Sequence, residues 1–230
     1  MHIVLIVGGT NEASNSLTVG KAFVDGMAKA GDMTVDTFRL KDMTIEHFTI
    51  EKHYTTPPQS NDDYYTIEKS IATADAVVIA TPIWNFSIPG NLKNFIDRLG
   101  AFGLDKETHS QGTLGGKPFY FILTGGMAKP GWTSFLSITT SHLQEAMRYF
   151  GGSIVGTHFE GRCTPGKGVF GLVVDKRTES LTAASAKGEA FAKLVDTFKK
   201  TGKLPLKNAL SYKLFRFAFG VVNRVVYMFD

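Results

Sequence analysis

The sequence has little cysteine, and this limits the chemistry open to the protein. Its 230 residues include one cysteine, Cys163. A single thiol cannot build a disulfide framework within the chain, nor can it hold a multi-cysteine metal or iron–sulfur site. A reducing compartment fits this composition best, and we therefore expect a cytoplasmic protein.

Long apolar runs are also absent from the amino terminus. The apolar stretch that starts at His2 ends at Gly8-Gly9-Thr10, with no charged segment before it and no small-residue cleavage site after it. This favours a short buried strand over a targeting signal. The hydrophobic content of 43% and the low net charge of +4 exclude disorder for most of the chain.

An excess of one charge sign is missing from most of the chain. Residues 203–230 hold five basic residues and one acidic residue, so residues 1–202 contain 20 of each sign. A nucleic-acid-binding face on residues 1–202 therefore has little support. We expect two parts, a body at 1–202 and a basic amphipathic helix within 203–230.

The body alternates short β-rich apolar runs with longer segments of helical period. This pattern is typical of a parallel sheet with crossover helices, which makes the fold class α/β. We expect the strands to be buried on both faces. They are predicted at Ile3–Val7, Thr34–Arg39, Ala76–Thr81, Phe119–Thr124 and Ile154–Phe159.

Five helices are expected between and after these strands. Apolar residues recur at helical spacing over 19–30, 92–99 and 191–198. Capping residues predict two further helices at about 63–73 and 133–150.

A polar loop, residues 8–18, follows the first predicted strand and opens the first helix. Amides at a helix start attract an anion, and the glycines allow close backbone approach. Hydroxyls of Thr10, Ser14, Ser16 and Thr18 could donate to a phosphate, and the loop contains no Lys or Arg. The pattern suits a phosphomonoester, and it matches neither the nucleoside-triphosphatase loop nor the dinucleotide glycine motif. A simple capped polar turn is the alternative.

An aromatic loop follows the third predicted strand. It reads Thr81-Pro82-Ile83-Trp84-Asn85-Phe86-Ser87-Ile88-Pro89-Gly90. Open α/β sheets bind ligands at the carboxyl ends of such strands. Trp84 and Phe86 could cover a flat ring, while Asn85 could bond to its edge. Aromatic residues that only close a helix–strand junction are the weaker alternative.

A third loop, Thr124-Gly125-Gly126, follows the fourth predicted strand and leads to Trp132. Paired glycines allow a ligand to approach the backbone. Trp132 could form the wall on the substrate side. A plain flexible loop would look similar, but all three loops leave the carboxyl ends of core strands.

These segments resemble those of the flavodoxin-fold NAD(P)H-dependent FMN oxidoreductases, the group of FMN reductases, azoreductases and quinone reductases. The most specific match is residues 81–98, which are similar to the azoreductase and quinone-reductase pattern of Pro, aromatic-Asn-Phe, then Leu-Lys-x-aromatic. The resemblance implies a three-layer flavodoxin-like fold with a five-stranded parallel sheet in the order 2-1-3-4-5. The first loop departs from the FMN-reductase form, which usually has Ser and Arg where this chain has Gly9 and Asn11.

The resemblance also implies which residues bind the cofactor FMN. Its phosphate is expected at Ser14, Asn15 and Ser16, its ring at Ile83, Trp84, Asn85 and Phe86, and the ring's polar edge at Thr124, Gly125 and Gly126. Thr10, Leu17 and Pro82 complete the predicted set.

The implied activity is passage of hydride from NAD(P)H, the co-substrate, through FMN to a quinone, azo or similar small acceptor. The implied assembly is a homodimer. The alternatives are a non-enzymatic flavodoxin-type electron carrier and a flavin-free binding module. No catalytic acid or base is assigned, because nothing in the spacing of His109, Tyr120 or His142 marks them, and no metal site is expected.

The basic tail is expected to form an extra helix at 207–229. Charges within its length argue against a transmembrane span. In one reading its apolar side packs on its own domain or on a dimer mate. In the other it lies in a membrane interface, as a peripheral contact.

Overall fold

Five parallel strands form the centre of the structure, a computed structural model that describes residues 1–53, 62–103, 112–134, 136–166, 169 and 171–226. They pair in the order β2-β1-β3-β4-β5, which confirms the expected flavodoxin-like topology. A crossover between non-consecutive strands brings β3 next to β1. The strands are β1 (His2–Val7), β2 (Thr34–Arg39), β3 (Ala76–Pro82), β4 (Pro118–Thr124) and β5 (Ser153–Glu160).

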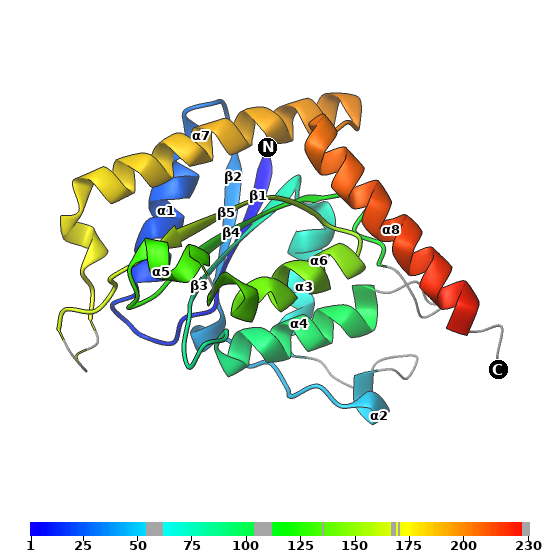
Figure 1. The fold of residues 1–230 in the computed structure, drawn as a ribbon, viewed down its shortest axis with the longest axis horizontal. Coiled ribbons are helices and arrows are strands. Elements are labelled where there is room, and N and C mark those ends of the chain that lie inside the picture. The colour runs from blue at the N-terminus through cyan, green and yellow to red at the C-terminus, as the bar shows by residue number, and fades with distance from the viewer. Residues whose placement is uncertain (54–61, 104–111, 135, 167–168, 170, 227–230) are drawn as a thin grey trace.

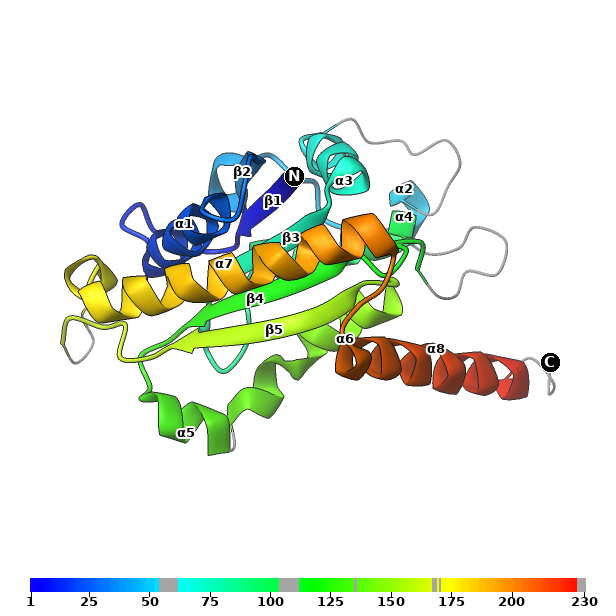
Figure 2. The same cartoon turned by 90° about the horizontal axis from the view of Figure 1, so that it is seen from above.

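Helices cover both faces of the sheet (Figures 1 and 2). One face carries α1 (Asn15–Ala28) and α7 (Thr178–Thr201). The other carries α3 (Tyr64–Thr73), α4 (Gly90–Gly103) and α6 (Ser141–Tyr149). The shorter elements are η1 (Leu40–Asp42), α2 (Ile50–His53), α5 (Lys129–Ser134), η2 (Leu136–Thr140) and η3 (Val174–Lys176). A long helix, α8 (Leu206–Val226), follows α7.

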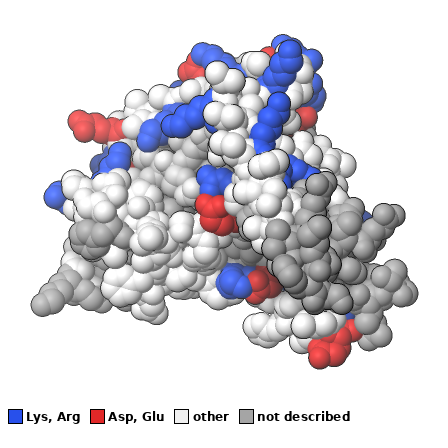
Figure 3. Space-filling view, turned by 45° about the vertical axis from the view of Figure 1, so that its right-hand side comes forward, with Lys and Arg blue, Asp and Glu red and all other residues white. Residues whose placement is uncertain are grey.

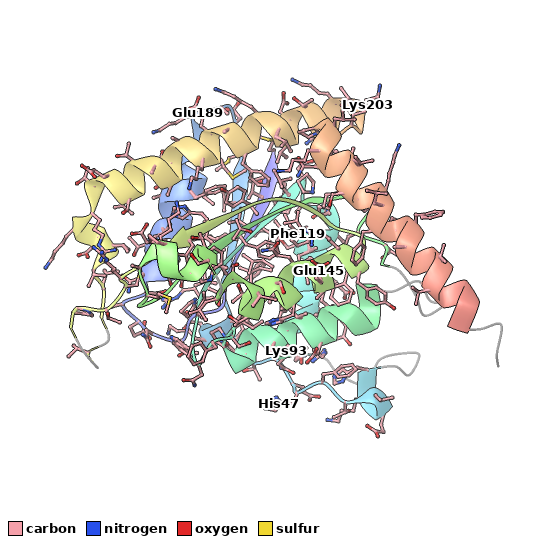
Figure 4. The ribbon with its side chains drawn as sticks, in the orientation of Figure 1. His47, Lys93, Phe119, Glu145, Glu189 and Lys203 are labelled. Atoms are coloured by element: carbon pink, nitrogen blue, oxygen red, sulfur yellow. The ribbon has the colours of Figure 1, made fainter. Side chains whose placement is uncertain are left out.

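A separate apolar core fills each side of the sheet. Phe119 of β4, labelled in Figure 4, belongs to the core beneath α3, α4 and α6. On the opposite side, α1 and α7 approach until their backbones touch. A Cβ atom at Gly26 would lie 1.9 Å from the carbonyl oxygen of Ser185, and one at Gly188 would lie 1.8 Å from that of Phe23. Glycine at both positions therefore allows this short separation of the two helices.

Two expectations about the elements are wrong. β2 and β5 are edge strands with one paired neighbour each, so they are not buried on both faces: no residue of β2 is fully buried, and residues 154–157 of β5 are half-buried. The single helix expected at 133–150 is divided into α5, η2 and α6, with Thr140 before the first residue of α6. Hydroxyls of Thr133, Thr139 and Thr140 bond to backbone carbonyls three or four residues earlier, an arrangement that competes with a continuous helix.

The carboxyl-terminal part contains the expected extra helix. Gly202 ends α7 with a φ of 65°, and α8 begins at Leu206. Residues 227–229 of the predicted helix lie outside the described residues. Within the described part of the chain, no helix is both long and apolar enough to cross a membrane. The division of the chain at residue 202 stays a prediction.

Candidate active site

Hydrogen bonds between loops join the carboxyl ends of neighbouring strands into one surface. The Gly8 amide donates to the carbonyl of Ala80 at 2.9 Å, and the Ile83 amide donates to that of Thr124 at 2.7 Å. The loops after β1, β3 and β4 therefore meet, as their sequence positions predict. Together with residues that follow β5, these loops line a cavity. Its lining residues are Gly9, Asn11, Ser14, Asn15, Ser16, Pro82, Ile83, Trp84, Thr124, Gly125, Gly126, Cys163, Thr164 and Gly171.

Ser14 fixes the start of α1 at one end of this cavity. Its backbone is extended, and its Oγ accepts a hydrogen bond from the Leu17 amide at 3.2 Å, so it is the N-cap of the helix. The Ser14 and Ser16 hydroxyls are 3.1 Å apart and buried. Two hydroxyls thus lie beside the positive end of a helix dipole, an arrangement that suits an anion.

Gly8 and Gly9 let the first loop lie against the second. A Cβ atom at Gly8 would lie 2.8 Å from Oγ1 of Thr81, and one at Gly9 would lie 3.2 Å from both Cδ of Pro82 and Oγ of Ser16. A side chain at Gly9 would also reduce the cavity, because Gly9, Pro82 and Ser16 line it. The two glycines therefore keep this space open.

The side chain of Asn15, which is predicted to bind the phosphate, forms its hydrogen bonds with backbone groups of the protein. Its Nδ2 donates to the carbonyl of Gly171 at 2.8 Å, and its Oδ1 accepts from the amides of Val173 and Val174. Asn15 lines the cavity, but its side-chain amide ties α1 to the segment before η3. Its part in holding that segment was not foreseen, because the partner lies 156 residues away.

No charged side chain lines this cavity among the described residues. Arg39, at the end of β2, reaches the adjacent loop, where its Nη2 contacts the carbonyl of Asn11 at 3.4 Å. Lys41 forms an ion pair with Glu12 at 2.5 Å and thereby lowers the pKa of that carboxyl. Neither basic residue was expected beside this loop. Arg39 ends β2 and Lys41 follows that strand, which is the neighbour of β1, and this position is the signal that could have found them.

The loop after β3 contains a tight, strained turn. Trp84 and Ser87 exchange two backbone hydrogen bonds, at 2.8 and 2.9 Å. The central residues Asn85 and Phe86 have φ values of 48° and 65°. Asn tolerates this region, whereas for Phe it costs about 1–3 kcal/mol. Phe86 is also 65% exposed, so an aromatic ring is held in solvent at a conformational cost.

An aromatic cavity of about 300 Å³ adjoins the first cavity. Ile83, Gly125 and Gly126 line both. Trp132 stacks on Phe159, with ring centres 4.6 Å apart and planes 7° apart, and this places Trp132 in the wall, as expected. The remaining lining residues are Asn85, Phe86, Met127, Leu136 and Thr139. Asn85 and Phe86 thus belong to this cavity and not to the first.

Two other predicted binding residues do not line either cavity. Thr10 is exposed, and Leu17 packs against the core while its amide is taken by Ser14. The binding roles assigned to the whole set stay predictions.

β5 and the segment that follows it contribute residues to the site that were not predicted from the sequence. Phe159, Thr164 and Gly171 line one or the other cavity, and Cys163 lines the first. Burial raises the pKa of the Cys163 thiol to about 11, so the sulfur is protonated at neutral pH. The Cys163 amide donates to the carbonyl of Gly125 at 2.9 Å, which holds this segment against the glycine pair.

Two of the three residues named as unassigned proton donors, His142 and Tyr120, do not line either cavity. His142 is exposed on α6. Tyr120 packs between Phe23 and Phe191 in the core, where burial raises its pKa to about 12. His109 lies outside the described residues. No group of three or more His, Cys, Asp or Glu side chains that could hold a metal occurs in the part of the chain that the structure describes.

A match to a model of a protein family shows to which family the chain belongs. The model described as NADPH-dependent FMN reductase matches residues 1–159. The chain belongs to this family. The match includes the first three loops of the site, whereas Cys163, Thr164 and Gly171 lie beyond it.

Curated relatives at about 31% identity agree with this family. FMN-dependent NADH:quinone oxidoreductase 5 of Pseudomonas fluorescens is 31% identical over 140 residues, which are 55% of this chain and 68% of the relative. The FMN-dependent NADH:quinone oxidoreductase of Nitratidesulfovibrio vulgaris is 31% identical over 138 residues, which are 53% and 66% of the two chains. The alignments thus span about two thirds of each relative.

Solved structures show the same fold at lower sequence identity. An NAD(P)H:quinone oxidoreductase from Methanothermobacter marburgensis has a TM-score of 0.65 and 18% identity, with 83% of this chain and 96% of that chain covered. An azoreductase from Bacillus anthracis has a TM-score of 0.61 and 17% identity, with 83% and 98% covered.

Proposed function

We propose that the chain is an FMN-dependent oxidoreductase that passes hydride from NAD(P)H through bound FMN to a quinone, azo compound or similar small acceptor. The observation that supports this most is the pair of adjoining cavities, one polar and uncharged, the other aromatic. The names of the relatives, which include quinone oxidoreductases and azoreductases, agree with it.

The residues at the start of α1 fit a phosphate. Ser14 and Ser16 supply hydroxyl donors beside the first-turn amides, and Gly9 leaves the space open. In place of an arginine within the loop, Arg39 lies next to it from β2. Its charge is shared with Glu12, at 3.4 Å, so hydroxyls and the helix dipole would supply most of the binding.

The residues after β3 and β4 fit a flat ring. Ile83 and Trp84 would cover one side, while the backbone of Thr124, Gly125 and Gly126 would approach its polar edge. When bound, FMN would supply the acceptance and return of hydride equivalents. The protein would orient the ring, exclude water from it, and hold a planar substrate against Phe86, Trp132 and Phe159.

A visible spectrum and a turnover assay test this proposal. We expect flavin absorbance after incubation with FMN, and consumption of NAD(P)H when a quinone or azo dye is added. Absence of flavin binding would overturn the proposal. Flavin binding without NAD(P)H consumption would favour the alternative, a non-enzymatic electron carrier.

A matched pair of variants connects the binding to the cavity. Gly9→Ala adds a methyl group 3.2 Å from Pro82 and Ser16, so we expect the Kd for FMN to rise about tenfold. Gly90→Ala, where no atom lies within 4 Å of the added methyl group, is the control and should bind FMN like the wild type.

We further propose a cytoplasmic homodimer with a peripheral contact to a membrane. Large apolar side chains at and near the aromatic cavity support the dimer, because Phe86, Met127 and Ile138 are all exposed. Sedimentation equilibrium would test the dimer, and a monomeric wild type at micromolar concentration would contradict it.

The single cysteine supports the cytoplasmic location. The membrane contact rests on α8.

A further inference from the structure

Helix α8 turns Asn208 and Arg216 toward the protein and a row of apolar residues toward solvent. It packs on β5 and α6 at the edge of the fold. Asn208 donates from Nδ2 to the carbonyl of Ile154 at 2.9 Å, and Arg216 donates from Nη1 to that of Gly112 at 3.3 Å. The Arg216 guanidinium also lies over the Tyr212 ring, 5.7 Å from its centre. Two side chains eight positions apart, Asn208 and Arg216, thus attach the helix to the body through hydrogen bonds.

The opposite side of α8 is an exposed apolar stripe. Leu206 is 84% exposed and Phe217 is 72% exposed, and the stripe consists of Leu206, Leu210, Leu214, Phe217 and Val221. At about 100° per residue, these five positions fall within about 80° of the helix surface. The reading in which this apolar side packs on its own domain is therefore wrong for these residues.

Basic residues flank the stripe. Lys207 and Lys213 are exposed and fall about 20° outside it, one on each side. Lys203, also exposed, lies in the turn that leads from α7 to α8 (Figure 4). No acidic residue occurs from Lys203 to Phe229 in the sequence. In the view of Figure 3, basic side chains gather at the upper part of the molecule, where α7 ends and α8 begins.

The geometry points to an anionic lipid bilayer as the partner of this stripe, and it deepens the proposed membrane contact. Apolar side chains with an exposed lysine on either side, Lys207 and Lys213, fit the boundary between acyl chains and negatively charged headgroups. A second copy of the chain fits less well, because a symmetric contact would bring the same lysines together without an acidic residue of α8 to pair with them. Figures 1 and 2 both show α8 at the periphery, with its carboxyl-terminal half extending away from the sheet.

Vesicle flotation of the full chain tests this inference. The probes are vesicles of phosphatidylcholine alone and of phosphatidylcholine with phosphatidylglycerol. We expect the protein to float with the anionic vesicles only, and to be released by high salt. Leu210→Ser with Phe217→Ser should reduce the bound fraction about tenfold or more. Ile50→Ser with Val169→Ser, which removes two apolar side chains that are also exposed, should leave binding unchanged.

The flavin spectrum of each variant and its sedimentation behaviour separate the outcomes. The stripe lies on α8 and neither cavity includes it, so we expect flavin content to stay equal whether or not the vesicles bind. A wild type that floats with neither vesicle overturns the inference, as does floating that the double variant retains. Dissociation of a dimer by the double variant, without vesicle binding of the wild type, would assign the stripe to a second copy instead.

Discussion

Oδ1 of Asn15 accepts a hydrogen bond from the backbone amide of Val173 at 2.9 Å. Because the amide of Val174 shares this oxygen at 3.2 Å, one side chain holds the segment after Gly171 against the start of α1. Gly171 itself lines the polar cavity. The site is thus completed by a part of the chain that follows the last strand.

Replacing this side chain should loosen the segment. Asn15→Leu keeps the approximate volume but removes the hydrogen bonds to the amides of Val173 and Val174. We expect both amides to exchange hydrogen faster even without FMN, and the Kd for FMN to rise about tenfold, since an unpartnered buried amide costs about 1–3 kcal/mol. Hydrogen-exchange mass spectrometry and flavin fluorescence measure the two effects. Unchanged exchange with weakened binding would instead assign the side chain directly to the cofactor.

The arrangement of the sheet follows from local pattern, which explains why it could be predicted. Continuous apolar runs such as β1, β3 and β4 have no stable position other than the centre of a parallel sheet. Which strand lies at the edge of the sheet cannot be predicted from local pattern, because it depends on which strand lacks a second neighbour. The sequence Thr34–Arg39 contains the polar residues that an edge strand tolerates, yet its neighbours are determined only by tertiary pairing.

The candidate site was predictable to the extent that its loops follow strands. The loops after β1, β3 and β4 lie at adjacent strand ends, so their meeting is a consequence of topology. The contributions of Cys163 and Gly171 depend on contacts between distant parts of the chain, and no local motif signals them. The inward side of α8 was unpredictable for a similar reason, because Arg216 binds a backbone carbonyl of Gly112 in place of water.

The strained turn at Phe86 predicts that a substitution there changes the KM without lowering the stability of the fold. Phe86→Gly relieves the positive φ, so we expect the free energy of unfolding to stay within about 1 kcal/mol of the wild type or to rise. The aromatic cover is lost, and the KM for a quinone should increase several-fold. Phe86→Leu keeps the strain with a smaller apolar surface and should be intermediate in KM. Thermal unfolding and steady-state kinetics provide the measurements, and a normal KM for Phe86→Gly would exclude substrate contact.

The contact between α1 and α7 predicts a large effect of a single methyl group. Gly188→Ala would place a Cβ atom 1.8 Å from the carbonyl oxygen of Phe23, so the helices must separate. We expect the free energy of unfolding to fall by about 1–3 kcal/mol, as overpacked cores show. Urea denaturation checks this value. Gly90→Ala is the control, and equal stability of the two variants would contradict the close backbone contact.

His158 predicts how stability depends on pH. Burial first, and the neighbouring Lys187 ammonium second, lower the pKa of His158 to about 4, from about 6.5 in an unfolded chain. Lys187 donates to Nδ1 at 2.6 Å, while the opposing carboxylate of Glu160 lies 3.6 Å from Nε2. Between pH 6.5 and 4 the unfolded chain therefore takes up a proton that the folded chain refuses, and the free energy of unfolding falls as the pH falls.

A substitution of His158 isolates this contribution. Between pH 7 and pH 5 the wild type should lose about 2 kcal/mol of stability through this group. His158→Gln can still accept from Lys187 but does not titrate, so its loss over the same interval should be smaller by that amount. His142→Gln, at an exposed position on α6, should lose as much as the wild type. Urea denaturation at both pH values gives the comparison. Equal losses of stability in all three proteins would contradict the prediction, because they would show that the pKa of His158 is the same in the folded and the unfolded chain.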